Sequence, residues 1–145
     1  SHIPSRWIDQ GAHHAIKLAK VPNRYIAGVI EIELSKHISD RTKWRKMIQG
    51  EYEDIDLSIK KYELLKFIPN QYKNYISDND ELVSIDYPMT QQPEKIKSIN
   101  MDKTPEFNGI LTGIKGQYLI FDNECVLNVR KYTGYIFNLA IMDPI

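Results

Sequence analysis

The segment NRYIAGVIEIELSKHISD, residues 23–40, has the clearest helical pattern in the chain and decides the character of its first half. Asn23 is a residue type that caps helices. Apolar side chains recur behind it at helical spacing, at Ile26, Val29, Ile30, Leu34 and Ile38. On a helical projection Glu33 and His37 fall inside this apolar stripe and Glu31 falls at its edge. Because a carboxylate on a buried face requires a partner, the pattern makes the two glutamates candidates for a functional or structural pairing.

The residues before this helix predict two short elements. A helix that carries Trp7 and Ile8 is expected to end near Gly11, since glycine readily takes the left-handed backbone conformation that ends helices. Residues 15–21 alternate in character, which is typical of a short strand, and Pro22 ends it.

Two further helices follow. The stretch SDRTKWRKMIQG predicts a helix capped by Ser39 or Asp40 and ended by Gly50. EDIDLSIKKYELLKFIP, residues 53–69, has acids at its beginning and lysines later, as the helix dipole prefers. Its apolar stripe is predicted at Ile55, Ile59, Tyr62 and Leu65. A short helix over residues 71–76 is expected next.

From Leu82 onward the pattern changes to strands and turns. The strand candidates are ELVSIDY, KIKSINM, FNGILTGI, GQYLIFD, CVLNVRKY and YIFNLAI. Asp122–Asn123 and Thr133–Gly134 are turn pairs between them. The sequence therefore predicts an α+β fold, with a mainly helical unit over residues 1–80 and a small antiparallel β-sheet or barrel over residues 81–145.

Composition limits the class of protein. The 145 residues suit one domain, or a small domain with an appendage, and 42% hydrophobic residues is too apolar for a disordered chain. Cys125 is the only cysteine, so no disulfide forms within the chain and a cytoplasmic location fits best. No apolar run approaches the ~20 residues that a membrane helix needs, and no membrane partner is expected.

Charge is balanced overall but unevenly distributed. Residues 1–50 carry nine Lys and Arg against four acids, and residues 51–86 carry four Lys against nine acids. This asymmetry favours a basic face that attracts polyanions. The alternative is that the acidic segment folds back and neutralises the basic one.

Few motifs of known chemistry occur. The chain has no P-loop, no G-x-G-x-x-G, no G-x-S-x-G and no H-E-x-x-H, and the adjacent pair His13–His14 points two ways. What remains is Arg6 on the first helix with Glu31 or Glu33 on the long one. An arginine fork matches phosphate oxygens, and a glutamate binds a divalent cation. The plain alternative is a structural ion pair between Arg6 and Glu31.

A second set of residues suits nucleic-acid binding without catalysis. Cations alternate with an aromatic ring on what is predicted to be one exposed helix, at Arg41, Lys43, Trp44, Arg45 and Lys46. The β unit adds Lys115, Tyr118, Arg130, Tyr132 and Tyr135. The alternative for each tyrosine is packing within the sheet. A third reading is a protein-interaction scaffold that uses the acidic segment from Glu51 to Asp56.

Three motifs carry a family resemblance. R-W-I-D-Q-G-A begins at Arg6, S-D-R-T-x-W at Ser39 and G-I-K-G-Q-Y-L at Gly113. With them, the chain resembles the carboxy-terminal part of a prokaryotic family filed as a domain of unknown function. That family pattern includes an upstream cysteine-rich, zinc-binding region, so we expect this chain to be the carboxy-terminal piece of a longer protein.

The family is in turn distantly similar to the GIY-YIG endonucleases. That similarity implies that Arg6 takes the catalytic arginine position and Glu31 the metal-binding glutamate position, with Mg²⁺ or Mn²⁺ as cofactor and DNA or RNA as substrate. The first hairpin of a GIY-YIG unit, which carries the tyrosine that activates water, has no counterpart in this chain. Cleavage is therefore expected only of the longer protein.

Overall fold

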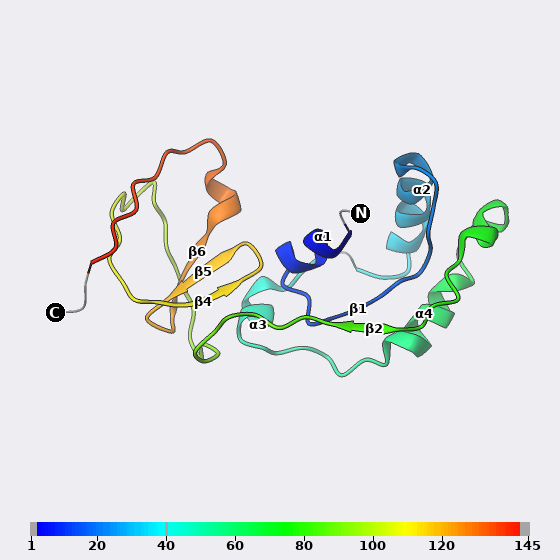
Figure 1. Cartoon of the computed structure of the whole chain (residues 1–145), viewed down its shortest axis with the longest axis horizontal. Helices are drawn as coiled ribbons and strands as arrows, with labels where there is room; N and C mark the ends of the chain where they lie inside the picture. The colour runs from blue at the N-terminus through cyan, green and yellow to red at the C-terminus, as the bar shows by residue number, and fades with distance from the viewer. Residues whose placement is uncertain (1–2, 40, 143–145) are drawn as a thin grey trace.

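The computed structural model describes residues 3–39 and 41–142 and has an α+β fold, as the sequence predicts. Its helices are α1 (Ile3–Asp9), α2 (Arg24–Ser35), α3 (Trp44–Ile48) and α4 (Leu57–Leu65), with 3-10 turns η1 (Asn70–Tyr75) and η2 (Val129–Tyr132). Its strands are β1 (His14–Ile16), β2 (Leu82–Ser84), β3 (Lys97–Ser98), β4 (Leu111–Lys115), β5 (Tyr118–Phe121) and β6 (Cys125–Asn128). The molecule is elongated, with the β3–β6 strands at one end, α2 and α4 at the other, and α1 and α3 between them (Figure 1).

Helix α2 forms for the local reasons that its sequence indicates. The Asn23 side chain accepts a hydrogen bond from the backbone N–H of Ile26 at 3.0 Å and caps the helix. Ile30 and Leu34 are buried and pack with Leu64 and Ile68 of the α4 region in a first hydrophobic core. The helix ends at Ser35, earlier than its apolar stripe predicts.

Of the apolar stripe predicted for α4, only Leu65 packs against the core, and the rest of the prediction is wrong. Ile55, Ile59 and Tyr62 are exposed, whereas Lys61 and Leu64 are buried. Lys61 can occupy the buried face because its ammonium is fully hydrogen-bonded. Its Nζ donates to the carbonyls of Ser77 and Asn79 and to the Asp80 carboxylate, at 2.7, 3.0 and 2.7 Å. A buried charge is tolerated when it is paired in this way.

Helix α3 is shorter than predicted and is not capped by Ser39. It begins at Trp44, and no side chain caps it. The Ser39 hydroxyl instead accepts a hydrogen bond from the backbone N–H of Arg41, which forms a local turn that competes with helix formation. Asp40, the other predicted cap, lies outside the described residues. The helix ends just before Gly50, as expected.

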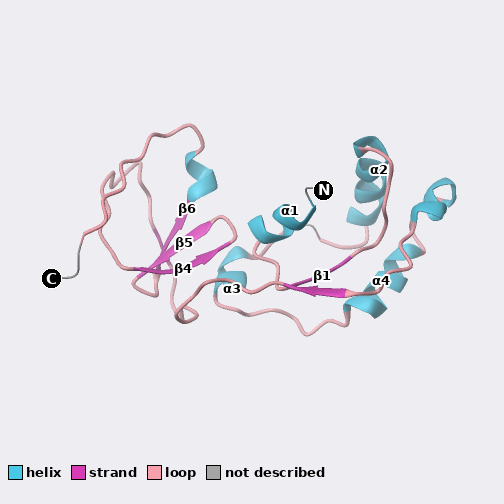
Figure 2. Ribbon diagram, viewed as in Figure 1, coloured by secondary structure: helices cyan, strands magenta, loops and turns pink. Residues whose placement is uncertain are grey.

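The strands form two small open sheets. β1 pairs antiparallel with β2, and the larger sheet has the order β3-β6-β5-β4. β4, β5 and β6 form the predicted antiparallel part of the sheet, but β3 pairs parallel with β6. Residues 88–90 hydrogen-bond along the outer side of β4, and β3 does not pair with β4, so the described strands do not close a barrel. Figure 2 shows how much of the chain between these strands is loop.

The strand predicted over residues 135–141 is wrong. The chain there is irregular, and Ile136 and Leu139 are 95% and 90% exposed. Alternating apolar residues form a strand only where a neighbouring strand edge pairs with their backbone, and none of the described strands pairs with this segment.

A second hydrophobic core lies under the larger sheet. Ile48 of α3 packs there with Tyr118, Ile120 and Val126 of β5 and β6. α3 therefore packs on the β unit, while β2 pairs with β1 of the first half. The predicted division into units 1–80 and 81–145 stays a prediction. Two elements contact the other side of that boundary: α3 packs on the sheet of the second unit, and β2 pairs with β1 of the first.

Candidate functional site

Arg6 and Glu31, the predicted catalytic residues, lie on two helices beside one groove. Arg6 is on α1, Glu31 is on α2, and both side chains are exposed. α1 and α2 stand on the same side of the β1–β2 ribbon (Figure 1). A cavity of about 820 Å³ is lined by Trp7, by Glu31 and apolar residues of α2, and by the segment 16–21, which includes Lys17 and Lys20. Glu31 therefore faces the groove, and Arg6 is next to a residue that lines it.

The alternative of a structural ion pair between Arg6 and Glu31 is wrong. In the part of the chain that the structure describes, no ion pair joins these two residues, and their exposure removes the need for one. Glu33, which the pattern placed on the buried face, is half-buried and pairs with Lys36 one turn later. His37 is exposed and stacks on Phe67, with 3.5 Å between ring centroids.

Trp44 and Tyr118, both predicted to bind nucleic acid, stack on each other where α3 packs on the sheet. Trp44 stacks on Tyr118, with ring centroids 5.3 Å apart and an interplanar angle of 10°. The Arg45 guanidinium lies 4.7 Å from the centre of the Trp44 ring and donates a hydrogen bond to the carbonyl of Ile96 at 3.1 Å. This stack holds α3 against the sheet, and Tyr118 is only 8% exposed.

The basic residues before α3 are more open. Arg41 and Lys43 are exposed and precede the helix, so the prediction that Arg41, Lys43, Arg45 and Lys46 share one helix is wrong. Among the described residues, the one ion pair that joins the basic segment 1–50 to the acidic segment 51–86 is Lys46–Glu51, at 3.9 Å. The acidic segment does not neutralise Arg41 and Lys43 by direct pairing.

Lys115, also predicted to bind nucleic acid, is a buried amine at the end of β4. It is 1% exposed. Its Nζ donates a hydrogen bond to the carbonyl of Met47 at 2.5 Å and shares a hydrogen bond of 2.8 Å with the Nε2 atom of His13. It also lies 5.8 Å from the centre of the Tyr87 ring. None of the ion pairs among the described residues includes Lys115.

The surroundings shift the protonation of this pair. Burial lowers the pKa of Lys115, because a poorly hydrated site disfavours the ammonium. Burial, then the charges of Lys115 and His14, lower the pKa of His13, while Asp86 acts in the opposite direction. Both groups are displaced toward their neutral forms, which is a common state of groups that perform proton transfer.

The sequence pattern did not connect His13 with Lys115. The two residues are 102 positions apart, and the sequence assigns no role to His13 or to the adjacent His14. No local spacing signals such a contact, because it depends on how the β4–β5 hairpin docks on the segment after α1.

Comparison with protein families shows the family to which the chain belongs. A family model described as a protein of unknown function, DUF2797, matches residues 1–137. The chain belongs to the DUF2797 family. Neither the curated proteins nor the solved structures give a match. Within the described residues, no helix combines the length and apolar character that a membrane span needs.

In this DUF2797 protein, the segments that begin at Arg6, Ser39 and Gly113 meet around α3 and the β4–β5 turn. Gln117 in the turn donates its backbone N–H to the carbonyl of Asp9 at the end of α1, at 3.1 Å. A Cβ on Gly116 would lie 2.6 Å from the same carbonyl oxygen, so the turn approaches α1 too closely for a side chain. The stack of Trp44 on Tyr118 joins the remaining motif to this contact.

Proposed function

We propose that this DUF2797 protein processes nucleic acid by metal-assisted phosphodiester hydrolysis at the groove between α1 and α2. The observation that carries the proposal is the exposed carboxylate of Glu31 on the wall of that groove, without an ion-pair partner among the described residues. The similarity to GIY-YIG endonucleases implies the same two helices, with an arginine on the first and a glutamate on the second.

The donor set of the groove suits Mg²⁺ or Mn²⁺ better than zinc. No cluster of three or more His, Cys, Asp or Glu side chains occurs among the described residues, so a closed zinc site has no ligands there. Mg²⁺ usually keeps several waters and uses one or two carboxylates together with substrate phosphate. Glu31 would supply that carboxylate, and a bound cation would stabilise negative charge on the leaving oxygen.

Arg6 has a separate role in the proposal. Its planar guanidinium presents several N–H donors in a fixed fork that matches phosphate oxygens. Placed beside the groove, it would offset the charge that develops on the phosphoryl group in the transition state. Removal of such a donor costs about 10²-fold or more in turnover. We therefore expect a loss of this size in Arg6→Ala.

The test is a cleavage assay on the full-length native protein, with labelled duplex and single-stranded DNA and RNA in Mg²⁺ or Mn²⁺. Glu31→Gln should abolish the metal-dependent cleavage while leaving stability unchanged, because its side chain is exposed. Glu33→Gln is the matched control on the same helix and should retain activity. Equal activity in the Glu31→Gln and wild-type proteins would contradict the proposal.

A second candidate, binding without cleavage, is favoured by the open cations Arg41 and Lys43. A protein that neutralises ~four phosphates loses affinity with salt at a log–log slope of roughly −3 to −4. Such a slope without cleavage of any substrate would support binding alone. A flat slope would exclude it and would leave a protein-interaction scaffold.

A further inference from the structure

Two buried lysines in this protein differ in how their ammonium groups are satisfied. Lys61 has three acceptors, including the carboxylate of Asp80, which accounts for all three N–H groups and for the charge. Lys115 has two acceptors, a carbonyl and an imidazole, and no carboxylate pairs with it among the described residues. Lys61 has the contacts of a structural residue, whereas Lys115 has one N–H group without a hydrogen-bond acceptor and no carboxylate partner among the described residues.

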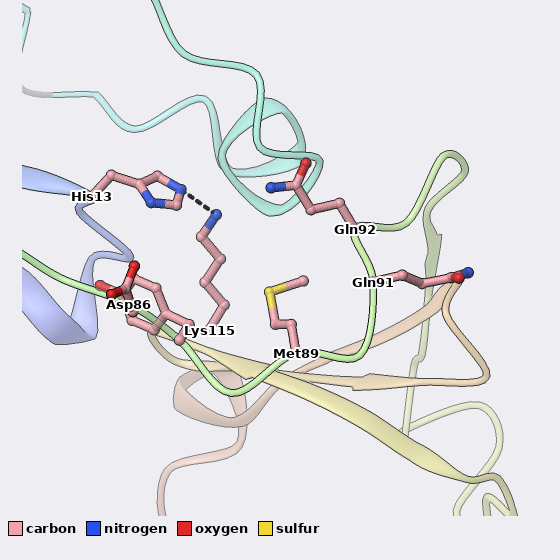
Figure 3. Close-up of a pocket in the computed structure, with 7 residues that line it drawn as sticks. His13, Asp86, Met89, Gln91, Gln92 and Lys115 are labelled. Atoms are coloured by element: carbon pink, nitrogen blue, oxygen red, sulfur yellow. Dashed lines mark hydrogen bonds between the residues drawn. The ribbon is translucent and has the colours of Figure 1, made fainter.

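A small cavity lies beside Lys115. Its volume is about 230 Å³, and its wall includes His13, Asp86, Tyr87 and Met89. Figure 3 shows the Lys115 side chain rising from the sheet toward the His13 ring, with the Met89 side chain next to it and Gln92 beyond. Since a water molecule takes up about 30 Å³ of liquid, the cavity holds a molecule of roughly ten heavy atoms or fewer.

We propose that Lys115 is a nucleophilic amine that forms an imine with a small uncharged aldehyde or ketone bound in this cavity, with His13 carrying the proton. The proposal is independent of the α1/α2 groove and of nuclease activity. It commits to an uncharged compound because the Asp86 carboxylate on the cavity wall repels anions such as oxo acids.

The contact between Nζ and Nε2 supports each proton movement of the step. The Lys115 ammonium donates to Nε2 of His13, so the imidazole can take that proton and leave a neutral amine. The nitrogen lone pair then attacks the carbonyl carbon, and the carbonyl oxygen receives the proton held by His13. The resulting carbinolamine loses its hydroxyl as water, with a proton taken from the nitrogen through His13. The products are a protonated imine and one water, so charge and atoms balance without an oxidant or reductant.

The polar and apolar residues on the wall of the cavity beside Lys115 also suit imine formation with a short uncharged aldehyde or ketone. Tyr87 points its hydroxyl away, toward the carbonyls of Ala12 and Ile8, at 2.9 and 3.3 Å. Its ring therefore faces the cavity side of Lys115, 5.8 Å from Nζ. With Met89 it provides the apolar surface that a short alkyl chain needs, beside the one reactive nitrogen.

The experiment is reductive labelling of the folded full chain with propanal and sodium cyanoborohydride at neutral pH, followed by peptide mapping. Lys115 should gain a propyl group faster than the exposed Lys97, since a lowered pKa leaves a larger fraction of the amine neutral at neutral pH. Lys97 is a suitable reference because its hydrogen bond with Glu124 raises its pKa. Lys61 should remain unlabelled until urea unfolds the chain.

Two variants keep the test decisive. Lys115→Arg retains donors for the Met47 carbonyl and should lose one fast label from the intact mass. His13→Gln retains a polar partner but cannot carry a proton, and it should slow Lys115 labelling about tenfold or more. Labelling of Lys115 no faster than that of Lys61 would overturn the proposal, because a purely structural lysine behaves in that way. Unchanged labelling in His13→Gln would overturn the proton-carrying role of His13.

Discussion

Gly116→Ala tests whether the β4–β5 turn is held against the end of α1. Gly116 has φ +59° in the two-residue connection between Lys115 and Tyr118, where glycine is favoured because it has no Cβ. An alanine there adds about 1–2 kcal/mol of backbone strain. Its Cβ would also lie 2.6 Å from the Asp9 carbonyl oxygen and 3.2 Å from the Asp9 carbonyl carbon.

The close approach of this Cβ to the Asp9 backbone destabilises the variant in addition to the backbone strain. Backbone atoms cannot move aside as the end of a flexible side chain can, and overpacking typically costs about 1–3 kcal/mol. Together the two effects predict that Gly116→Ala lowers the free energy of unfolding by about 2–5 kcal/mol. Gly134→Ala is the matched control, because Gly134 has φ +91° and no atom lies within 4 Å of its would-be Cβ. It should lose only the strain, about 1–2 kcal/mol.

Urea unfolding followed by tryptophan fluorescence measures both variants. Trp44 reports on the core that includes Tyr118 and Ile120, so its signal follows the part of the fold that the turn supports. The comparison uses midpoints at unchanged denaturant slope, which report stability. If Gly116→Ala and Gly134→Ala are equally destabilised, the contact between the turn and α1 contributes nothing, and the docking of the three motifs is not what holds this region together.

Further predictions concern the buried ammonium and the open cations. Lys61→Met should cost about 1–3 kcal/mol by leaving two backbone carbonyls without a donor, whereas Lys60→Met, in an exposed pair, should change stability by about 0.5 kcal/mol or less in the same urea assay. The hydrogen bond from Lys61 lowers the pKa of Asp80, so the carboxylate contributes stability at pH values above its unfolded-state pKa of about 3.9. That contribution is lost as pH falls through the lower folded-state value, and Asp80→Asn should flatten acid unfolding below about pH 4; an unchanged profile would show that this pair does not set it. If the chain binds nucleic acid, Arg41→Ala with Lys43→Ala should reduce the salt slope by about 2, as filter binding at several salt concentrations would show.

The local elements follow from local chemistry, which is why they were predictable. The Asn23 cap requires an interaction only three residues long, and the predicted turn at Asp122–Asn123 requires only that these two residues adopt positive φ between β5 and β6. The α+β class and the antiparallel β4–β5–β6 meander could be read from such short-range patterns. The open exposure of Glu31 agreed with its place at the edge of the predicted stripe.

Tertiary packing decided which faces are buried and which side chains meet. Lys61 displaced Ile59 and Tyr62 from the buried side of α4 because acceptors from residues 77–80 reach its ammonium, and no periodicity in α4 records where those acceptors lie. The contact of His13 with Lys115 spans 102 residues. Apolar spacing constrains neighbours on one helix or strand, whereas contacts over such separations depend on how whole elements dock. The sequence by itself therefore named Arg6 and Glu31 as candidates, whereas only the tertiary structure brought His13 and Lys115 together.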